Sequence, residues 1–459
     1  MTSLPHTRLK DLRVASLVYN DAHNDARVLK AARSLADNGA EVEIVAVARE
    51  AQGHPAGKES RGNHVVINRV PAFTLDQIAG PLAPQLRKRL GFGAPGTSMR
   101  TPGNEGQPNR PPARVVSTRA QKKSPTSQAS RALLRFARKA AVSAWGPVSL
   151  AYYWVGATRT LLSEDNDVVL ANDANTLVPA LILRALKGTN FVYDSHELWR
   201  RRNVPKRRIA PYVEAAIERV GITRASRVMT VSPSIAEWLK RAYNLDELPA
   251  LVRNIPSEAP VPDRSEGRLH DLAGLSSDIP IISYGGGITT SRGIEETIDA
   301  LALMDPNVHL VMLGYGAEDY IESLHQRAKK RGVAHRIHVV GPVAPDEVTS
   351  ALADGDVAVV HIRPTCLSYR FALPNKLFES IRAGLPVVAA DLPDLAAIIR
   401  ELGVGRTVAL EDPSSLADAL TAVLRDGDAF RAAAREAAPN LTWEREVEAL
   451  IEGIQEAAQ

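Results

Sequence analysis

The stretch from Leu373 to Asp391 constrains the fold of this chain more than any other, because it contains the start and end of a helix and the strand that follows. Pro374 suits the first helical position, since its φ is fixed near the helical value and its missing N–H is not needed there. Gly384 is placed to end the helix, and the apolar run from Pro386 predicts a buried strand. A helix that leads directly into such a strand is typical of a parallel α/β sheet.

The rest of the chain repeats this alternation of strand and helix. Its 459 residues exceed the roughly 250–300 that one hydrophobic core supports, so two domains are expected. The pattern predicts doubly wound parallel sheets, whose ligands bind at the carboxyl ends of the strands. We expect a helix over 25–38 and strands over 14–19, 42–48, 167–171, 190–194, 227–231 and 279–284. The linker between the domains is predicted at 251–262.

The start of the helix after Pro374 is suited to bind a nucleoside diphosphate. The first N–H groups of a helix have no partner within it and the helix dipole favours negative charge there, so the amides near Pro374–Lys376, which start after the proline, can hold phosphates. The Lys376 ammonium adds a positive charge, and Glu379, one turn later, can accept hydrogen bonds from two ribose hydroxyls. The pattern predicts a nucleotide-sugar site if a second phosphate-facing loop lies opposite.

Such a second loop follows the strand predicted at 279–284. It begins with the glycine triplet 285–287, which lets the backbone approach a ligand, and ends at Arg292 and Gly293, where the guanidinium can pair with phosphate oxygens. Thr290 stands where a dinucleotide fingerprint needs glycine, so the spacing does not support a hydride-transfer enzyme. Alone, the loop is equally a glycine-rich turn with a solvated arginine, but the two loops together favour a diphosphate site.

These motifs resemble those of the family-four retaining glycosyltransferases, which have the GT-B fold. The loop motif is matched by Gly286, Gly287, Arg292 and Gly293, and the helix motif by Glu379 followed by Gly-x-Pro-Val-Val at 384–388. A nearer subgroup of the family reads Leu-Pro-Asn-Lys-Leu-Phe-Glu, as residues 373–379 do here. In the N-terminal half the matching residues are Asp173, the run 193–198, Val231, Ser232, Arg253 and Asn254. The resemblance covers nearly the whole chain outside 76–160.

The resemblance implies an α/β protein of GT-B fold, with two Rossmann-like, doubly wound parallel-sheet domains that face a cleft. Residues 1–252 would form the acceptor domain, with an insertion at 76–160. Residues 253–432 would bind the nucleotide sugar. Residues 433–459 would form a C-terminal helix that returns to the N-terminal domain.

The implied activity is the transfer of a sugar, with retention, from a UDP- or GDP-type nucleotide-diphosphate sugar to a glycan or lipid-linked acceptor. Bacterial surface polysaccharide or glycolipid synthesis is the expected setting. The donor-binding residues implied by the motifs are Gly286, Gly287, Arg292, Pro374, Asn375, Lys376 and Glu379. Arg292 and Lys376 would stabilise the departing diphosphate, as a metal ion does in other enzymes, so we expect neither a metal nor a cofactor.

Polar residues at the ends of the N-terminal strands complete the predicted site. His196 resembles the family's histidine that touches the donor sugar, so it joins Arg292 and Lys376 as a catalytic candidate. The acceptor-binding candidates are Asp21, Asn24, Arg27 and Asp173. Asp173 has an alternative role, as the cap of a helix that starts near residue 175.

Two departures from the family pattern leave other functions open. The family's first glutamate, eight residues before the ribose-binding one, is Phe371 here, and an arginine often found after the glycine-rich strand is Gly287. These changes keep two alternatives: a non-catalytic subunit that binds a sugar nucleotide or glycan, and an epimerase on the same fold. The intact Glu379, Arg292 and His196 favour the transferase.

The insertion at 76–160 breaks the alternation. Its first part is rich in proline, glycine and basic residues, which predicts disorder, and residues 130–154 combine an apolar face with Arg131, Arg135, Arg138 and Lys139. Such a basic amphipathic helix can lie on an anionic membrane surface, with Trp145, Tyr152, Tyr153 and Trp154 as interfacial anchors. The alternative is an ordinary domain helix with a solvated basic face.

The remaining features concern location and partners. No apolar run reaches the ~18 residues of a membrane span, and one cysteine, Cys366, excludes an internal disulfide. A net charge of only +4 and the lack of a recognition motif argue against nucleic acid as a partner. We expect a cytoplasmic protein that reaches the inner face of the plasma membrane through 130–154.

Overall fold

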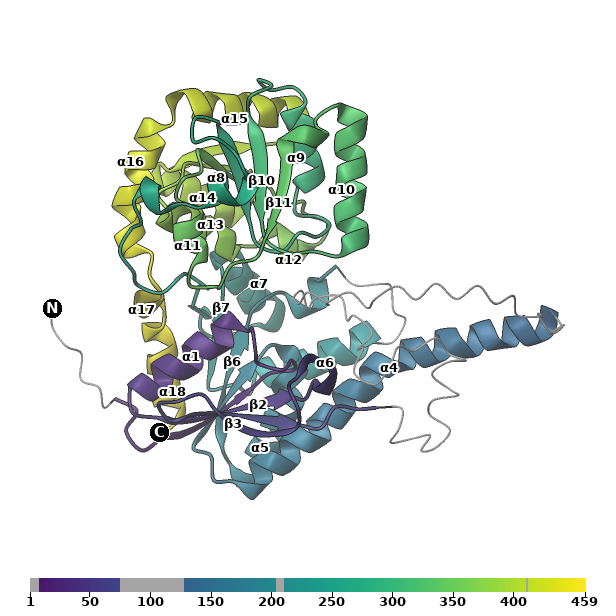
Figure 1. The fold of residues 1–459 in the computed structure, drawn as a ribbon. Helices are drawn as coiled ribbons and strands as arrows, with labels where there is room; N and C mark the ends of the chain where they lie inside the picture. Colours follow the sequence, from purple (N-terminus) through teal and green to yellow (C-terminus); the bar gives the residue numbers. More distant parts are fainter. Residues whose placement is uncertain (1–7, 75–127, 204–209, 410–411) are drawn as a thin grey trace. The chain divides into compact units, whose positions relative to one another are not determined.

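A computed structural model describes residues 8–74, 128–203, 210–409 and 412–459, and within α4 it describes side chains from Trp145 onward. The predicted disordered stretch of the insertion therefore lies outside the described residues. Packing divides the chain into two compact units, 1–189 and 190–459 (Figure 1). The predicted domain boundaries at 252 and 432 stay predictions.

Unit 1 is a mainly parallel sheet with helices. Its strands lie in the order β3-β4-β2-β1-β5, and all neighbours are parallel except β3 and β4. The elements are β1 (Arg13–Leu17), α1 (Ala26–Asp37), β2 (Glu41–Val47), β3 (Gly57–Ser60), β4 (Val65–Val70), α4 (Gln128–Ser163), β5 (Val168–Asn172) and α5 (Leu177–Lys187). Asp25 caps α1 by accepting a hydrogen bond from the Val28 N–H, which is why the helix begins where the sequence predicts.

Unit 2 begins with three parallel strands and their helices. The strand order is β6-β7-β8. The elements are β6 (Asn190–Ser195), α6 (Ala210–Ile222), β7 (Arg227–Thr230), α7 (Pro233–Tyr243), β8 (Ala250–Leu251) and α8 (Leu269–Ala273).

A six-stranded parallel sheet in the order β11-β10-β9-β12-β13-β14 follows in unit 2. Its strands and helices are β9 (Ile281–Gly285), α9 (Ile294–Leu301), β10 (His309–Leu313), α10 (Glu318–Arg331), β11 (Ile337–Gly341), α11 (Val348–Ala351), β12 (Val357–Val360), α12 (Leu367–Arg370), α13 (Asn375–Arg382), β13 (Val387–Ala390), α14 (Pro393–Leu402), β14 (Gly405–Val408), α15 (Pro413–Asp426) and α16 (Asp428–Ala437).

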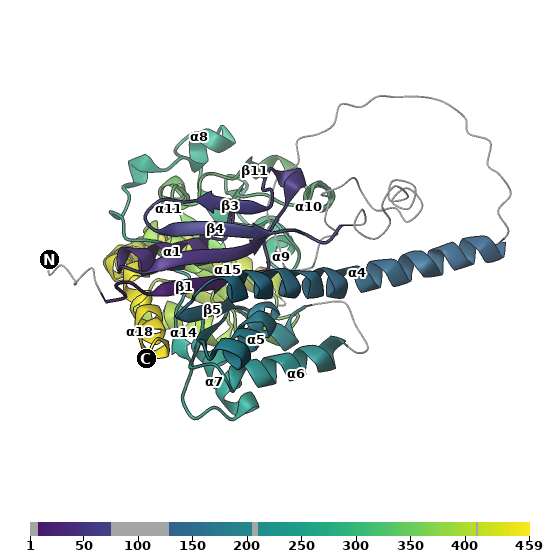
Figure 2. The ribbon, with the colours of Figure 1, turned by 90° about the horizontal axis from the view of Figure 1, so that it is seen from below.

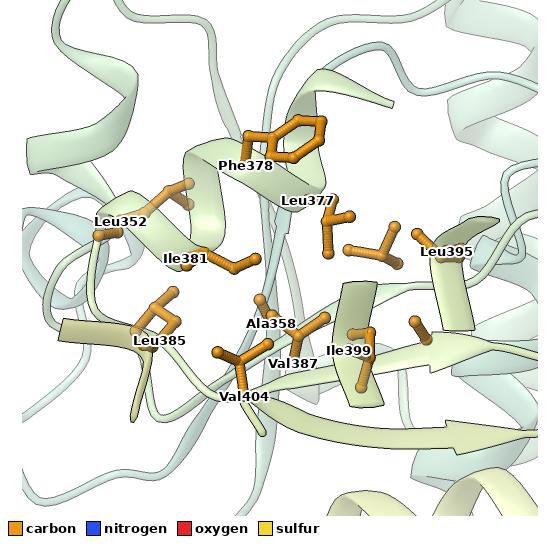
Figure 3. Packing of buried hydrophobic residues seen from close by; sticks show 14 of the residues in the cluster. Leu352, Ala358, Leu377, Phe378, Ile381, Leu385, Val387, Leu395, Ile399 and Val404 are labelled. Carbon is orange, nitrogen blue, oxygen red and sulfur yellow. The ribbon is translucent and has the colours of Figure 1, made fainter. Parts of the chain in front are cut away.

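Each face of this sheet has its own hydrophobic core. Successive strand residues point to opposite faces, so Val387 packs under α13 and α14 while Val388 packs with α9 and α15. Figure 3 shows Leu377 and Ile381 of α13 pointing toward Val387, with Ile399 of α14 beside them. The core therefore holds the start of α13 at the carboxyl edge of the sheet.

The chain ends in two short helices, α17 (Trp443–Glu446) and α18 (Glu448–Ala457). α18 packs on β6 and β7, where the Asn190 side chain donates a hydrogen bond to the Ala457 carbonyl at 2.9 Å. A side chain at Gly453 would overlap Met229 on β7. The C-terminal helix thus lies on strands that the sequence assigns to the first domain.

The helix predicted over 130–154 is part of α4, a single 36-residue helix that lies along α5 (Figure 2). Two of the four proposed membrane anchors are instead packed within unit 1. Tyr153 is 1% exposed and donates a hydrogen bond to the Val45 carbonyl at 3.1 Å, and the Trp154 indole donates to the Asn175 carbonyl at 2.6 Å. Tyr153 is therefore buried in the protein and cannot act as an interfacial anchor, whereas Trp154 is half-buried, with its indole N–H already bonded to the protein.

Among the described residues, no helix combines the length and the apolar character needed to cross a membrane.

Candidate functional site

The first turn of α13 lies at the carboxyl edge of the six-stranded sheet. Pro374 has an extended backbone, with φ −77° and ψ 148°, and so precedes the helix by one residue rather than occupying its first position. Pro374, the N-cap residue, makes no side-chain hydrogen bond to this end of the helix. The amides at the start of α13, from Asn375 onward, therefore keep the geometry that an anion can use.

Lys376 on α13 is tied to the glycine-rich loop through an aromatic ring. Its side chain is 8% exposed, and its ammonium lies 3.7 Å from the centroid of the Tyr284 ring at the end of β9. The Tyr284 hydroxyl in turn donates a hydrogen bond to the Gly287 carbonyl at 2.6 Å. This arrangement fixes a buried positive charge beside both predicted phosphate-binding segments.

The glycine-rich loop has two positions that favour glycine, Gly286 for its backbone angle and Gly293 for its angle and a close contact. Gly286 has φ +102°, and its N–H donates to the Leu313 carbonyl at 2.9 Å. Gly293 has φ +69°, and a Cβ there would overlap the carbonyl oxygen of His361. The loop therefore has one fixed path from β9 to α9.

Arg292, next to Gly293, is half-buried and lies against a second aromatic ring. Its guanidinium carbon is 5.1 Å from the centroid of Tyr369 on α12. Lys376 and Arg292 thus both lie on tyrosine rings, which the sequence analysis missed because no local spacing links Tyr284 and Tyr369 to these cations. Glu379 is half-buried on α13, three residues after Lys376 and so on the same side of the helix.

His196 directly follows β6, as the sequence predicts. Its Nε2 lies 3.1 Å from the Asp194 carboxylate, which is 2% exposed. An ionised carboxylate only accepts hydrogen bonds, so Nε2–H is the donor and the pair fixes both the ring's tautomer and its orientation.

Phe371 ends α12, at the position where the family pattern has a glutamate. Its backbone carbonyl accepts a hydrogen bond from the Ser232 hydroxyl at 2.8 Å, and Ser232 caps α7. Position 371 therefore supplies a backbone contact and no carboxylate.

The acceptor candidates all belong to unit 1. Asp21 accepts a hydrogen bond from the His23 N–H at 3.1 Å and lies 3.7 Å from the Arg49 guanidinium. Asn24 is exposed, whereas Arg27 is 4% exposed and so does not present its guanidinium to open solvent.

Asp173 follows β5 with φ +62° and ψ 162°, in a conformation that side chains rarely adopt. It precedes the short 3₁₀ turn at 174–176, but its side chain makes no capping hydrogen bond. The alternative role of Asp173 as a side-chain cap is therefore wrong. A strained backbone at a strand end costs roughly 1–3 kcal/mol and is typical of functional sites.

No metal site accompanies these groups in the part of the chain that the structure describes: nowhere do three His, Cys, Asp or Glu side chains gather as metal ligands would.

Comparison with known proteins identifies both halves of the chain. Residues 25–254 match the model of a glycosyl transferase 4-like domain, and residues 279–426 match that of glycosyl transferases group 1. A D-inositol 3-phosphate glycosyltransferase of Corynebacterium diphtheriae is 25% identical over 314 residues, covering 65% of this chain and 68% of that protein. For further relatives of the same name, from Xylanimonas cellulosilytica and Nocardia farcinica, the chain spans about half of their length.

Solved structures show the same fold at low identity. Sucrose-phosphate synthase from Thermosynechococcus elongatus superimposes with a TM-score of 0.65 at 15% identity, covering 96% of this chain and 97% of that one. Anabaena HepE in complex with UDP-glucose gives 0.60 at 15% identity, covering 96% and 98%. With the two parallel α/β sheets, these likenesses confirm the predicted GT-B fold.

Proposed function

Because this chain belongs to the group 1 glycosyltransferases with a glycosyl transferase 4-like domain, we propose that it moves a sugar from a nucleotide-diphosphate sugar to a glycan or lipid-linked acceptor, with retention of configuration. The observation that carries the proposal is the buried Lys376 ammonium, held on Tyr284 between the start of α13 and the glycine-rich loop. A related fold, that of HepE, holds UDP-glucose.

The cations act on the leaving group. Breaking the bond between sugar and diphosphate builds negative charge on the diphosphate, and Lys376, Arg292 and the first amides of α13 stabilise that charge. Because these groups are held in place before the reaction, they need no reorganisation when the charge develops. A divalent ion is then not required, and the donor is of the UDP or GDP type.

His196 acts on the donor sugar. The buried Asp194 fixes its ring through Nε2, so the opposite edge of the ring, which bears Nδ1, has a defined direction in which to contact a sugar hydroxyl. No side chain among the predicted site residues is placed as a covalent nucleophile, which agrees with front-face retention as proposed for the family. Glu379 accepts hydrogen bonds from the ribose hydroxyls.

A second candidate function follows from position 371. Without a carboxylate there, the site lacks one group that approaches the donor sugar in the family, and a non-catalytic subunit that binds a sugar nucleotide would have the same structure. Turnover distinguishes the two. A GT-B epimerase would instead convert the sugar nucleotide itself, without an acceptor.

The test follows the donor by NMR. Wild-type protein is incubated with UDP-glucose and GDP-mannose, and release of the diphosphate and the anomeric configuration of the first sugar product are recorded. We expect slow release of a sugar with retained configuration, at least tenfold slower in His196→Ala. Arg13→Gln, at the amino end of β1, is the matched surface control. Inverted product, or no turnover of any donor by a protein that binds one, would contradict the transferase.

Membrane delivery of a lipid-linked acceptor, in bacterial surface polysaccharide or glycolipid synthesis on the cytoplasmic side, stays part of the proposal. With Tyr153 buried and the Trp154 indole bonded within unit 1, attachment would depend on the basic positions between 131 and 139. Each basic residue near an anionic surface contributes about 1 kcal/mol, so reversing these four charges should release the protein from anionic vesicles in co-sedimentation. Equal sedimentation of both proteins would leave this segment as a domain helix.

A further inference from the structure

A cluster of arginines and histidines gathers at the carboxyl edge of the unit 1 sheet. The strands β1, β2 and β4 are parallel, so the loops after β1 and β2 and the end of β4 meet at one edge. Ligands of open α/β sheets bind at this edge. The members of the cluster are Asp21, His23, Arg49, His54, Glu59, Arg61 and Arg69.

The two histidine rings are stacked by the turn that follows β2. Arg49 and His54 exchange backbone hydrogen bonds of 2.6 and 3.1 Å, which closes the turn between them. The His54 ring then lies on that of His23, with centroids 3.9 Å apart and planes inclined by 28°. The turn thus brings an otherwise distant histidine to the loop that contains Asp21.

The hydrogen bonds determine the state of both rings. The Arg61 guanidinium donates to His23 Nδ1 at 3.1 Å, so His23 is neutral and carries its proton on Nε2. Burial lowers the pKa of His54, so this ring is also neutral at physiological pH. Each neutral ring has one N–H that can donate a hydrogen bond.

Arg69 has a donor that the protein does not use. Its side chain is 2% exposed; Nε donates to the Asp21 carbonyl at 2.9 Å, and Nη1 pairs with Glu59. The buried Nη2 has no hydrogen-bond partner. Leaving a charged donor unsatisfied in the interior is costly, so Arg69 Nη2 is suited to donate to an acceptor oxygen of a ligand.

The charges are not balanced within the cluster. Three guanidinium groups, those of Arg49, Arg61 and Arg69, face the two carboxylates of Asp21 and Glu59. One positive charge is left over, at the edge of the sheet where the acceptor candidates lie.

We propose that this cluster binds an oxyanion, a phosphate or a carboxylate, carried by the acceptor, with Arg61, Arg69 and the two histidines as donors. The proposal rests on the proposed function, because it assigns the substrate class of the acceptor side of the same enzyme. A purely structural role, in which the arginines only fasten the β3–β4 hairpin, makes the opposite prediction for ligand binding.

The test is calorimetry of the full chain at low ionic strength, with UDP and GDP in excess so that phosphate cannot report on the donor site. The probes are inorganic phosphate, myo-inositol 1-phosphate and glucuronate, with myo-inositol and glucose as neutral counterparts. We expect saturable binding of a phosphorylated probe or of glucuronate but of neither neutral sugar; which of them binds distinguishes phosphate from carboxylate. Arg61→Gln and His23→Gln should each weaken this binding about tenfold.

The control is Arg13→Gln, since Arg13 also pairs with a glutamate, Glu41 at 3.7 Å, but at the opposite edge of the sheet. It should leave anion binding unchanged. Absence of saturable anion binding, or binding that Arg61→Gln and His23→Gln do not weaken in folded protein, would overturn the inference. If the wild type binds nucleotide sugars but no anionic probe, only this inference fails; if it binds no nucleotide sugar, the proposed function fails as well.

Discussion

Two features favour glycine at position 293: a left-handed backbone and a close contact with His361. Replacing Gly293 by alanine, in comparison with the same change at Gly332, separates their costs. Gly293 has φ +69° and ψ 16°, and Gly332, at the end of α10, has almost the same backbone, φ +75° and ψ 14°. A Cβ at Gly332 meets no atom within 4 Å, whereas one at Gly293 would overlap the His361 carbonyl oxygen and lie 2.7 Å from the His361 Cβ. Gly332→Ala is therefore a matched control for the backbone term alone.

The two substitutions should differ by the cost of the overlap. A left-handed backbone costs a residue with a Cβ roughly 1–2 kcal/mol, and this applies to both positions. Forcing an extra methyl group into a packed site adds roughly 1–3 kcal/mol, and this applies to Gly293 only. The difference in the free energy of unfolding, from urea denaturation of the full chain, should thus be about 1–3 kcal/mol.

The same comparison links the loop to ligand binding. To relieve the overlap, the loop must move together with Arg292, so Gly293→Ala should also weaken nucleotide-sugar binding in calorimetry, while Gly332→Ala should not. Equal losses of stability in the two variants, with donor affinity unchanged in both, would refute the reasoning that the loop is pinned against His361.

Three further predictions concern the donor, metal and pH. Glu379→Ala should weaken nucleotide-sugar binding by about 1–3 kcal/mol, through lost charged hydrogen bonds to the ribose, and unchanged affinity in calorimetry would remove Glu379 from the site. Turnover should survive EDTA, because cationic side chains take the place of a divalent metal ion at the diphosphate. A loss of turnover that Mg²⁺ or Mn²⁺ restores would show that the enzyme needs a metal. His309 and His338 lie with ring nitrogens 2.9 Å apart, and burial lowers the pKa of both, so the unfolded chain binds more protons below about pH 6.5 and stability should fall on acidification. His338→Gln should flatten this fall in thermal melts between pH 7.5 and 5.5.

The parallel sheets were predictable from the sequence because the hydrophobic periodicity and the helix-capping residues indicate the same strands and helices. The strand predicted over 14–19 is Arg13–Leu17, and the helix predicted over 25–38 is Ala26–Asp37, bounded by Asp25 and Asn38 at its caps. The short strands β3 and β4 were not predicted. Three of the four residues of β3 are exposed, so it lacks the apolar pattern that marks the buried strands.

The parts of the site that lie within one sequence motif were predictable. The contacts between segments distant in sequence were not. The α13 start and the glycine loop each have a local signature, so Lys376 and Arg292 were found. Each of these two cations lies far in sequence from the tyrosine that it contacts, and His23 is likewise distant from His54. Only the folded chain brings the members of each pair together. The burial of Tyr153 escaped prediction for the same reason: an aromatic residue on an amphipathic helix has the same pattern facing a membrane or a protein core.

The central claim is that unit 2 binds a nucleotide sugar between the start of α13 and the glycine-rich loop. The most direct measurement is a thermal-shift screen of wild type and Lys376→Gln against UDP, GDP and their sugar conjugates. A ligand that binds the native state at a hundred times its Kd stabilises by about 2.7 kcal/mol, which moves the melting temperature by a few degrees. We expect one nucleotide series to stabilise the wild type and to lose most of that effect in Lys376→Gln. Melting temperatures that no nucleotide changes, or an equal rise in both proteins, would contradict the account.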